Sequence, residues 1–144
     1  MLIGEYSHSL DNKNRLSMPA KFRKSLGKKV VMTRGLDTCI FVFTTGEWEK
    51  IAEKLAAQSV GSRDARDLNR FFLSGAVEVD VDSAGRVLVP EYLKTFANLE
   101  TKVTLAGLYS RVEIWNEDTW GKRQQNITEN ADLVASKLQE IGMI

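Results

Sequence analysis

The chain has 144 residues, of which 43% are hydrophobic and 27% are charged, as in one globular domain or two tightly coupled half-domains. No apolar run approaches the roughly 18 residues of a membrane helix, and the first residues lack the basic start and apolar middle of a signal peptide. Because Cys39 is the only cysteine, an internal disulfide is excluded, and we expect a cytosolic protein.

The net charge of +1 hides an uneven distribution of charge along the chain. Between Asn12 and Leu36 there are basic residues and no acidic ones. The basic residues of this run are Lys13, Arg15, Lys21, Arg23, Lys24, Lys28, Lys29 and Arg34. The equivalent segment of the second half, residues 83–108, is balanced. This asymmetry favours a polyanion as partner of the first half, with a solvated basic surface as the alternative.

One stretch of sequence occurs twice. Residues 11–19 read Asp-Asn-Lys-Asn-Arg-Leu-Ser-Met-Pro, and residues 82–90 read Asp-Ser-Ala-Gly-Arg-Val-Leu-Val-Pro. The aspartate, arginine and proline of the second copy each follow those of the first by 71 residues (11 and 82, 15 and 86, 19 and 90). Both prolines of the chain lie in these stretches, which indicates an internal duplication.

Each copy predicts a tight turn between two strands. Before the second turn, valines at 77, 79 and 81 alternate with acids at 78, 80 and 82, the period of a strand with one buried face. The aspartate can accept backbone N–H bonds, Gly85 suits positive φ, and Asn14 tolerates it. We therefore expect each half to open with a β-hairpin. The turn-structuring residues are Asp11, Asp82, Gly85, Pro19 and Pro90.

A short helix is predicted after each proline, over residues 19–26 and 90–96, because proline suits the first helical position. Phe22, Leu26, Leu93 and Phe96 would face inward. Two further strands are expected in each half, at 29–33 and 39–43 and at 102–106 and 111–115.

Apolar residues at helical spacing predict helices at 47–56 and 64–73, between the two halves. After a polar segment at 121–126, Ala131, Val134, Leu138 and Ile141 predict a last helix. We divide the chain into a first half-domain (1–50), a helical insert (51–73), a second half-domain (74–121) and a C-terminal helical tail (122–144).

The duplicated Asp-x-x-x-Arg turn followed by proline resembles the MraZ family. These are bacterial transcriptional regulators of the division and cell-wall gene cluster, built as a tandem of two SpoVT/AbrB-type half-domains. The resemblance covers nearly all of the chain and is weakest after about Gly121. The family's first turn usually reads Asp-x-Lys-Gly-Arg, and here Asn14 replaces the glycine.

The resemblance implies an α+β fold, mainly β: a pseudo-two-fold, swapped-hairpin AbrB-like β-barrel made by the two half-domains, with a helical insert and a C-terminal helix. It also implies a ring-shaped homo-oligomer and a nucleoid-associated repressor. Family members bind double-stranded DNA at promoter direct repeats, including those of their own operon. An enzymatic activity, a cofactor, a membrane partner or a small-molecule substrate is not expected.

The candidate DNA contacts lie around the turns. An arginine just past a tight turn can project its guanidinium toward guanine edges or phosphates. Arg15 and Lys13 are the main candidates, and the alternative for Arg15 is a structural ion pair with Asp11. The same alternative fits Arg86 and Asp82 at least as well. The full set is Arg15, Lys13, Arg86, Asn14, Lys21, Arg23, Lys24 and Arg34, with Lys28 as a further phosphate contact.

The sequence gives little support for a metal site or a catalytic site. Glu78, Asp80 and Asp82 form an acidic row, interpreted as a solvated face, with a metal site or contact with a neighbouring protomer as alternatives. His8 and Cys39 each occur once, so a zinc cluster or Cys–His pair within one chain is not expected. Cys39 is interpreted as a core residue, and Trp48, Trp115 and Trp120 as core or subunit contacts rather than base-stacking residues.

A second function is an AbrB-like antitoxin or an oligomeric scaffold that binds a protein partner. An antitoxin would normally carry a disordered tail, whereas residues 129–141 show the spacing of an amphipathic helix. The preferred function therefore remains sequence-specific DNA binding.

Overall fold

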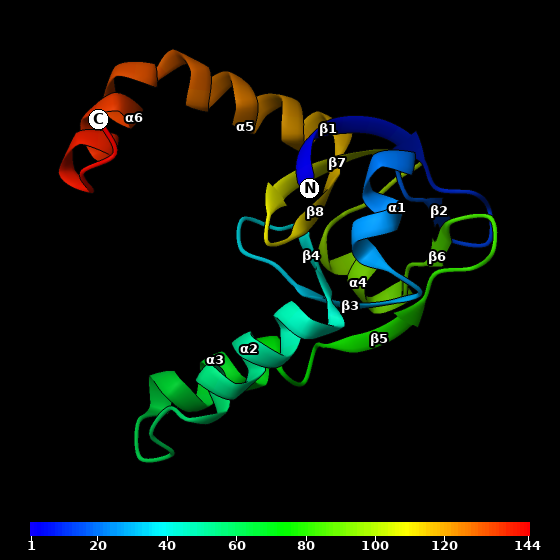
Figure 1. The fold of residues 1–144 in the computed structure, drawn as a ribbon, viewed down its shortest axis with the longest axis horizontal. Coiled ribbons are helices and arrows are strands. Elements are labelled where there is room, and N and C mark those ends of the chain that lie inside the picture. The colour runs from blue at the N-terminus through cyan, green and yellow to red at the C-terminus, as the bar shows by residue number, and fades with distance from the viewer.

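The computed structural model describes residues 1–144 as an α+β protein of eight strands and six helices (Figure 1). The elements of the first half are β1 (Leu2–Ser9), β2 (Arg15–Ser17), α1 (Ala20–Leu26), β3 (Lys29–Arg34), β4 (Ile40–Thr44), α2 (Thr45–Ala56) and α3 (Arg63–Phe72). Those of the second half are β5 (Val77–Asp80), β6 (Arg86–Leu88), α4 (Glu91–Phe96), β7 (Lys102–Tyr109), β8 (Val112–Asn116), α5 (Glu117–Glu129) and α6 (Ala131–Glu140).

The main sheet is antiparallel and mixes the two halves, in the order β1-β7-β8-β4-β3-β5. The first strand of each half pairs with a strand of the other half, since β1 pairs with β7 and β5 with β3. In the middle of the sheet β4 pairs with β8, again across the halves. The halves are therefore interleaved rather than placed side by side.

The prediction that each half opens with a β-hairpin is wrong. Apart from a single bridge between Leu10 and Leu16, the strands flanking the first turn do not pair with each other. Instead β2 pairs with β6 in a separate two-stranded sheet, which we call the β2–β6 ribbon. This pairing places Leu16 opposite Val87, and both are almost completely buried. Short strands gain more from burying such a cross-strand pair than from a local turn alone.

A closed barrel is absent, because the main sheet ends at two free edges, β1 and β5, and the ribbon forms a sheet of its own. One continuous hydrophobic core nevertheless joins the halves and includes Leu16, Val87, Ile40 and Ile114. The chain thus has a single core shared by both copies of the repeat.

The short helices after the prolines are confirmed. Pro19 and Pro90 precede α1 and α4 with φ of −52° and −59°, which suits a helix start. Phe22, Leu26 and Leu93 are buried in the core, as expected, and Phe96 is half-buried. Only two residues separate the end of each ribbon strand from the helix that follows it, so these helices lie close to the ribbon in sequence.

Two helical pairs extend from the sheet (Figure 1). The helix α3 packs back along α2, and its Phe71 contacts Phe96 with the ring centroids 5.9 Å apart. In the other pair, the predicted polar segment 121–126 is helical and belongs to α5, whose N-cap is Asn116. Ala131, Val134 and Leu138 of the predicted apolar stripe lie on α6, and Ile141 directly follows it, but no residue of α6 is buried. None of the six helices combines the length and apolar character needed to cross a membrane.

The expected core roles of Cys39 and Trp115 are confirmed. Cys39 is fully buried, its thiol donates to the Leu36 carbonyl at 3.1 Å, and burial raises the thiol pKa far above its usual range. Trp115 is buried beside Trp120, whereas Trp48 is half-buried and packs on Phe43.

Candidate nucleic-acid interface

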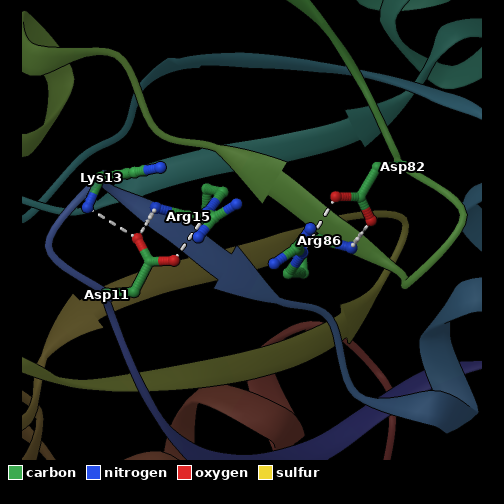
Figure 2. A network of polar contacts seen from close by, with 5 residues as sticks. All are labelled: Asp11, Lys13, Arg15, Asp82 and Arg86. Carbon is green, nitrogen blue, oxygen red and sulfur yellow. Dashed lines mark hydrogen bonds and ion pairs between the residues drawn. The ribbon is translucent and has the colours of Figure 1, made fainter.

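The two Asp-x-x-x-Arg turns are equivalent bond for bond (Figure 2). In the first turn the amides of Lys13 and Arg15 both donate to Asp11 Oδ1 at 2.8 Å. The Arg15 Nε donates to Asp11 Oδ2 at 2.7 Å. One carboxylate therefore holds the turn and also fixes the arginine that follows it.

The second turn repeats this pattern at Asp82. Its Oδ1 accepts from the amides of Ala84 and Arg86 at 2.9 and 2.8 Å, and its Oδ2 accepts from Arg86 Nε at 2.9 Å. In both turns the aspartate amide donates to the carbonyl of the arginine, at 3.0 Å in the first and 2.9 Å in the second. The predicted turn-structuring role of Asp11 and Asp82 agrees with this geometry.

The hydrogen bonds keep both carboxylates ionised. The Arg15 amide, followed by the Arg15 side chain and the Lys13 amide, lowers the pKa of Asp11 to about 2. The corresponding bonds, led by the Arg86 amide, lower the pKa of Asp82. Each turn therefore keeps its Asp–Arg pair charged throughout the physiological pH range.

The fourth position of each turn has positive φ, 60° at Asn14 and 78° at Gly85. Asn14 is fixed by its side chain: its Nδ2 donates to Glu91 Oε2 at 2.7 Å, and its Oδ1 accepts from Lys94 Nζ at 2.9 Å. Asparagine adopts this backbone conformation more readily than most residues. The replacement of the family's glycine is thus accommodated by bonds to α4 of the other half.

At the second turn, the Arg23 side chain from α1 occupies the space that a side chain at position 85 would need. A Cβ added to Gly85 would come within 2.3 Å of the Arg23 Nε, and that Nε donates to the Met18 carbonyl at 3.0 Å. Arg23 and Lys94 are equivalent positions, 71 residues apart. Each turn is therefore braced by a basic residue from the helix of the opposite half.

The β2–β6 ribbon has one buried and one outer face. Leu16 and Val87 point into the core, whereas Arg15, Arg86 and Leu88 alternate with them and face outward. The side chains of Arg15 and Arg86 keep 34% and 36% of their surface exposed. Figure 2 shows both arginines between the two aspartates, and each is the first residue of its ribbon strand.

In both arginines only the Nε is engaged within the chain. No hydrogen bond or ion pair of the structure uses an Nη group of Arg15 or Arg86. The structural ion pair and an accessible guanidinium, considered above as alternatives, therefore coexist. The Nη donors form a pair of oriented forks on the outside of the ribbon.

The other predicted basic residues fall into two groups. Lys13, Lys21, Lys24 and Lys28 are exposed, and none of their side chains has a partner in an ion pair or hydrogen bond. Arg34 is different: its Nη1 donates to the Phe71 carbonyl at 3.0 Å, and its guanidinium lies 5.9 Å from the centroid of the Phe71 ring.

The acidic row meets a basic residue of its own chain. Lys29 Nζ lies 3.5 Å from Glu78 and 3.9 Å from Asp80, whereas Asp82 belongs to the turn. No group of three or more His, Cys, Asp or Glu side chains is arranged to hold a metal ion.

Sequence reasoning missed Glu91 and Lys94, which bond to the first turn, and Ser17 and Leu88, which lie on the outer face of the ribbon. The offset of 71 residues pairs Lys94 with Arg23 and was the available signal for Lys94. Ser17 and Leu88 face outward only because β2 pairs with β6, a pairing without a local sequence signal.

Comparison with known proteins gives a consistent assignment. The family model described as "MraZ protein, putative antitoxin-like" matches twice, at residues 1–71 and 72–140, which confirms the internal repeat. Proteins named "Transcriptional regulator MraZ" from Caldicellulosiruptor saccharolyticus and Alkaliphilus metalliredigens are 43% and 42% identical over 143 residues. One from Clostridium botulinum is 44% identical. These alignments cover 99% of this chain and 100% of each relative. The chain therefore belongs to the MraZ family.

Proposed function

We propose that this protein is a transcriptional regulator that binds double-stranded DNA sequence-specifically through the outer face of the β2–β6 ribbon. The names of its relatives support the regulatory role. The observation that carries the proposal is the pair of oriented guanidinium groups of Arg15 and Arg86, whose Nη donors are free and face outward.

A two-stranded ribbon fits the major groove of B-DNA, which is about 12 Å wide. An arginine whose Nε is already fixed by a carboxylate loses less side-chain entropy when its Nη groups bind guanine O6 and N7. In this proposal Arg15 and Arg86 contact base edges, and Asn14 lies beside them at the ribbon end.

The exposed lysines supply the non-specific part of the binding. Lys13, Lys21, Lys24 and Lys28 would contact phosphates and release counterions, which makes the affinity fall steeply with salt. We place Arg23 and Arg34 second in the interface, because their guanidinium groups already donate to carbonyls of their own chain.

We further propose a ring-shaped homo-oligomer that acts as a cytoplasmic, nucleoid-associated repressor of its own operon in the division and cell-wall gene cluster. A protomer with a net charge of +1 binds DNA weakly, whereas several ribbons on one ring can engage direct repeats together. The interleaved strands support two SpoVT/AbrB-type half-domains joined by a helical insert and followed by a helical tail.

A mobility-shift titration with DNA from upstream of the protein's own gene tests the proposed interface. Arg15→Ala should weaken binding by about 1–3 kcal/mol, or roughly 5- to 150-fold, if Arg15 reads a base. Arg63→Ala, which removes an exposed arginine of α3, is the matched control and should change binding little. Unchanged affinity of Arg15→Ala, with the oligomer intact, would remove Arg15 from the interface.

A further inference from the structure

The internal repeat extends into the helical pairs. Trp48 of α2 and Trp120 of α5 are 72 residues apart, and each follows the last sheet strand of its half. The two family-model matches end at residues 71 and 140, so each reaches the second helix of its pair. The helix α6 is thus the counterpart of α3.

In the first half, α3 returns to the sheet, and its C-terminal end packs against the end of β3. The Phe72 carbonyl accepts from Thr33 Oγ1 at 2.7 Å, and the Phe71 carbonyl accepts from Arg34 Nη1 at 3.0 Å. Gly75 lies directly against the end of α3, since a Cβ at Gly75 would come within 2.9 Å of the Phe71 carbonyl. The end of α3 therefore covers the outer part of β3 beside α2.

The equivalent place in the second half is open. The strand register makes Ala106 and Gly107 the counterparts of Thr33 and Arg34, and Gly4 the counterpart of Gly75. A groove of about 500 Å³ lies there, between α5 and the β1–β7 edge of the sheet. Gly4, Ala106, Gly107, Leu108, Trp120 and Ile127 line one part of the groove, and the charged residues Glu5, Asp37, Arg111, Glu113 and Arg123 line the rest with Trp115 and Gln124.

The chain's own α6 does not cover this groove. Residues 57–62 separate α2 from α3 and allow α3 to turn back, whereas only Asn130 separates α5 from α6. Figure 1 shows α6 at the far end of α5, away from the sheet. As a result, α6 and the residues after it expose apolar side chains to solvent, namely Leu133, Val134, Ile141, Met143 and Ile144.

We propose that α6 and residues 141–144 of one copy, which we call the arm, occupy the groove of a second copy. Burying one aliphatic side chain removes roughly 60–120 Å² of apolar surface from water. The five exposed side chains of the arm would therefore bury roughly 300–600 Å², and Leu108 and Ile127 of the groove would add to this. The arm's share is smaller than the roughly 800 Å² that each partner contributes to a standard interface, and is typical of a small interface.

The arm and the groove are different surfaces of the same protomer, so their contact is heterologous. Repeated contacts of this kind close into a ring when the rotation between neighbours permits. The inference deepens the proposed ring assembly and rests on it, and it assigns the arm as the element that joins neighbouring protomers.

Two single variants of the full-length protein test this contact by sedimentation velocity. Val134→Asp alters the arm, and Ile127→Asp alters the groove. Each should lower the assembled mass to that of the protomer, because a buried unpaired carboxylate opposes association. Val60→Asp is the matched control, since Val60 is 76% exposed in the α2–α3 connection, and it should assemble like the wild type. Leu108→Asp provides a second groove variant that leaves α5 unchanged.

Mixing the two variants gives the sharper result. The unaltered arm of Ile127→Asp and the unaltered groove of Val134→Asp can still form one junction, so an equimolar mixture should form heterodimers and no larger species. Wild-type assembly of either variant, or a mixture that stays monomeric, would overturn the proposal. A monomeric wild type would overturn it as well.

Binding to a DNA fragment with a single repeat separates this inference from the proposed function. Both variants should bind that fragment as the wild type does, because neither alters the ribbon. If they bind normally yet assemble normally, the arm proposal fails and the DNA-binding proposal stands. If Arg15→Ala binds like the wild type while these variants lose assembly, the reverse holds.

Discussion

The two turns of this protein have the same backbone hydrogen bonds but different side chains between the aspartate and the arginine. Both are held by one aspartate that accepts two amide bonds and one arginine Nε bond. Between aspartate and arginine, the first turn carries Lys13 and Asn14, whereas the second carries Ala84 and Gly85. The Asp–Arg pair therefore sets the turn, and the residues between aspartate and arginine can differ in charge.

The turns also reach the same positive φ by different means. Asn14 is held by side-chain bonds to Glu91 and Lys94, whereas Gly85 leaves room for Arg23. The first turn therefore depends on polar bonds at its surface, and the second depends on the absence of a side chain. Substitutions at these positions should affect the two turns differently.

The largest loss of stability should follow from breaking the ribbon that joins the turns. Leu16→Ala removes a fully buried side chain and should lower the free energy of unfolding by about 2–5 kcal/mol. Val87→Ala should cost less, because it removes two side-chain carbon atoms rather than three. Urea unfolding should show one transition by both circular dichroism and tryptophan fluorescence, since the halves share one core. Two separate transitions would contradict the interleaved fold.

An exchange at the fourth turn position should have a smaller effect and should be asymmetric. Gly85→Asn forces the Arg23 side chain to move and should destabilise the protein by about 1–3 kcal/mol. Asn14→Gly loses one exposed and one partly buried side-chain bond and should cost no more than about 1 kcal/mol. Thermal unfolding of the two variants measures both effects, and the opposite order would contradict the proposed bracing by Arg23.

The smallest expected effect is on the free energy of unfolding at low pH. The pKa of Asp11 is about 2 in the folded protein against an ordinary value of 3.8, so Asp11 stabilises the fold fully above about pH 4. That contribution is lost as the pH falls from about 4 to 2, and the lowered pKa of Asp82 acts in the same direction. Asp11→Asn should therefore lose less stability than the wild type over this pH range. Equal pH slopes in urea titrations would show that Asp11 is not bonded as described.

The turns and the short helices could be predicted from the sequence because their signals are local. The aspartate, the arginine and the proline each act within a few residues, and the offset of 71 residues confirms their equivalence. The pairing of β2 with β6 could not be predicted, because the choice between a hairpin and an exchanged partner depends on long-range packing of Leu16 and Val87.

Two further features lacked a readable signal. The helix α5 buries no residue and carries a largely polar sequence, so hydrophobic periodicity gave no indication of it beyond Trp120. Arg23 and Lys24 are neighbours in one basic run, yet only Arg23 reaches the second turn. Which basic residue braces a turn and which remains free depends on the direction of its side chain from α1.

The proposed interface places the outer face of the β2–β6 ribbon against DNA. A photoactivatable crosslinker attached at Ser17→Cys, which pairs with Arg86 on the ribbon and lies two residues from Arg15, tests this placement, with Cys39 buried and Val60→Cys as the control. We expect efficient crosslinking of Ser17→Cys to operator DNA, reduced by unlabelled operator, and background crosslinking from Val60→Cys. Background crosslinking from both positions, under conditions in which the operator is bound, would contradict it.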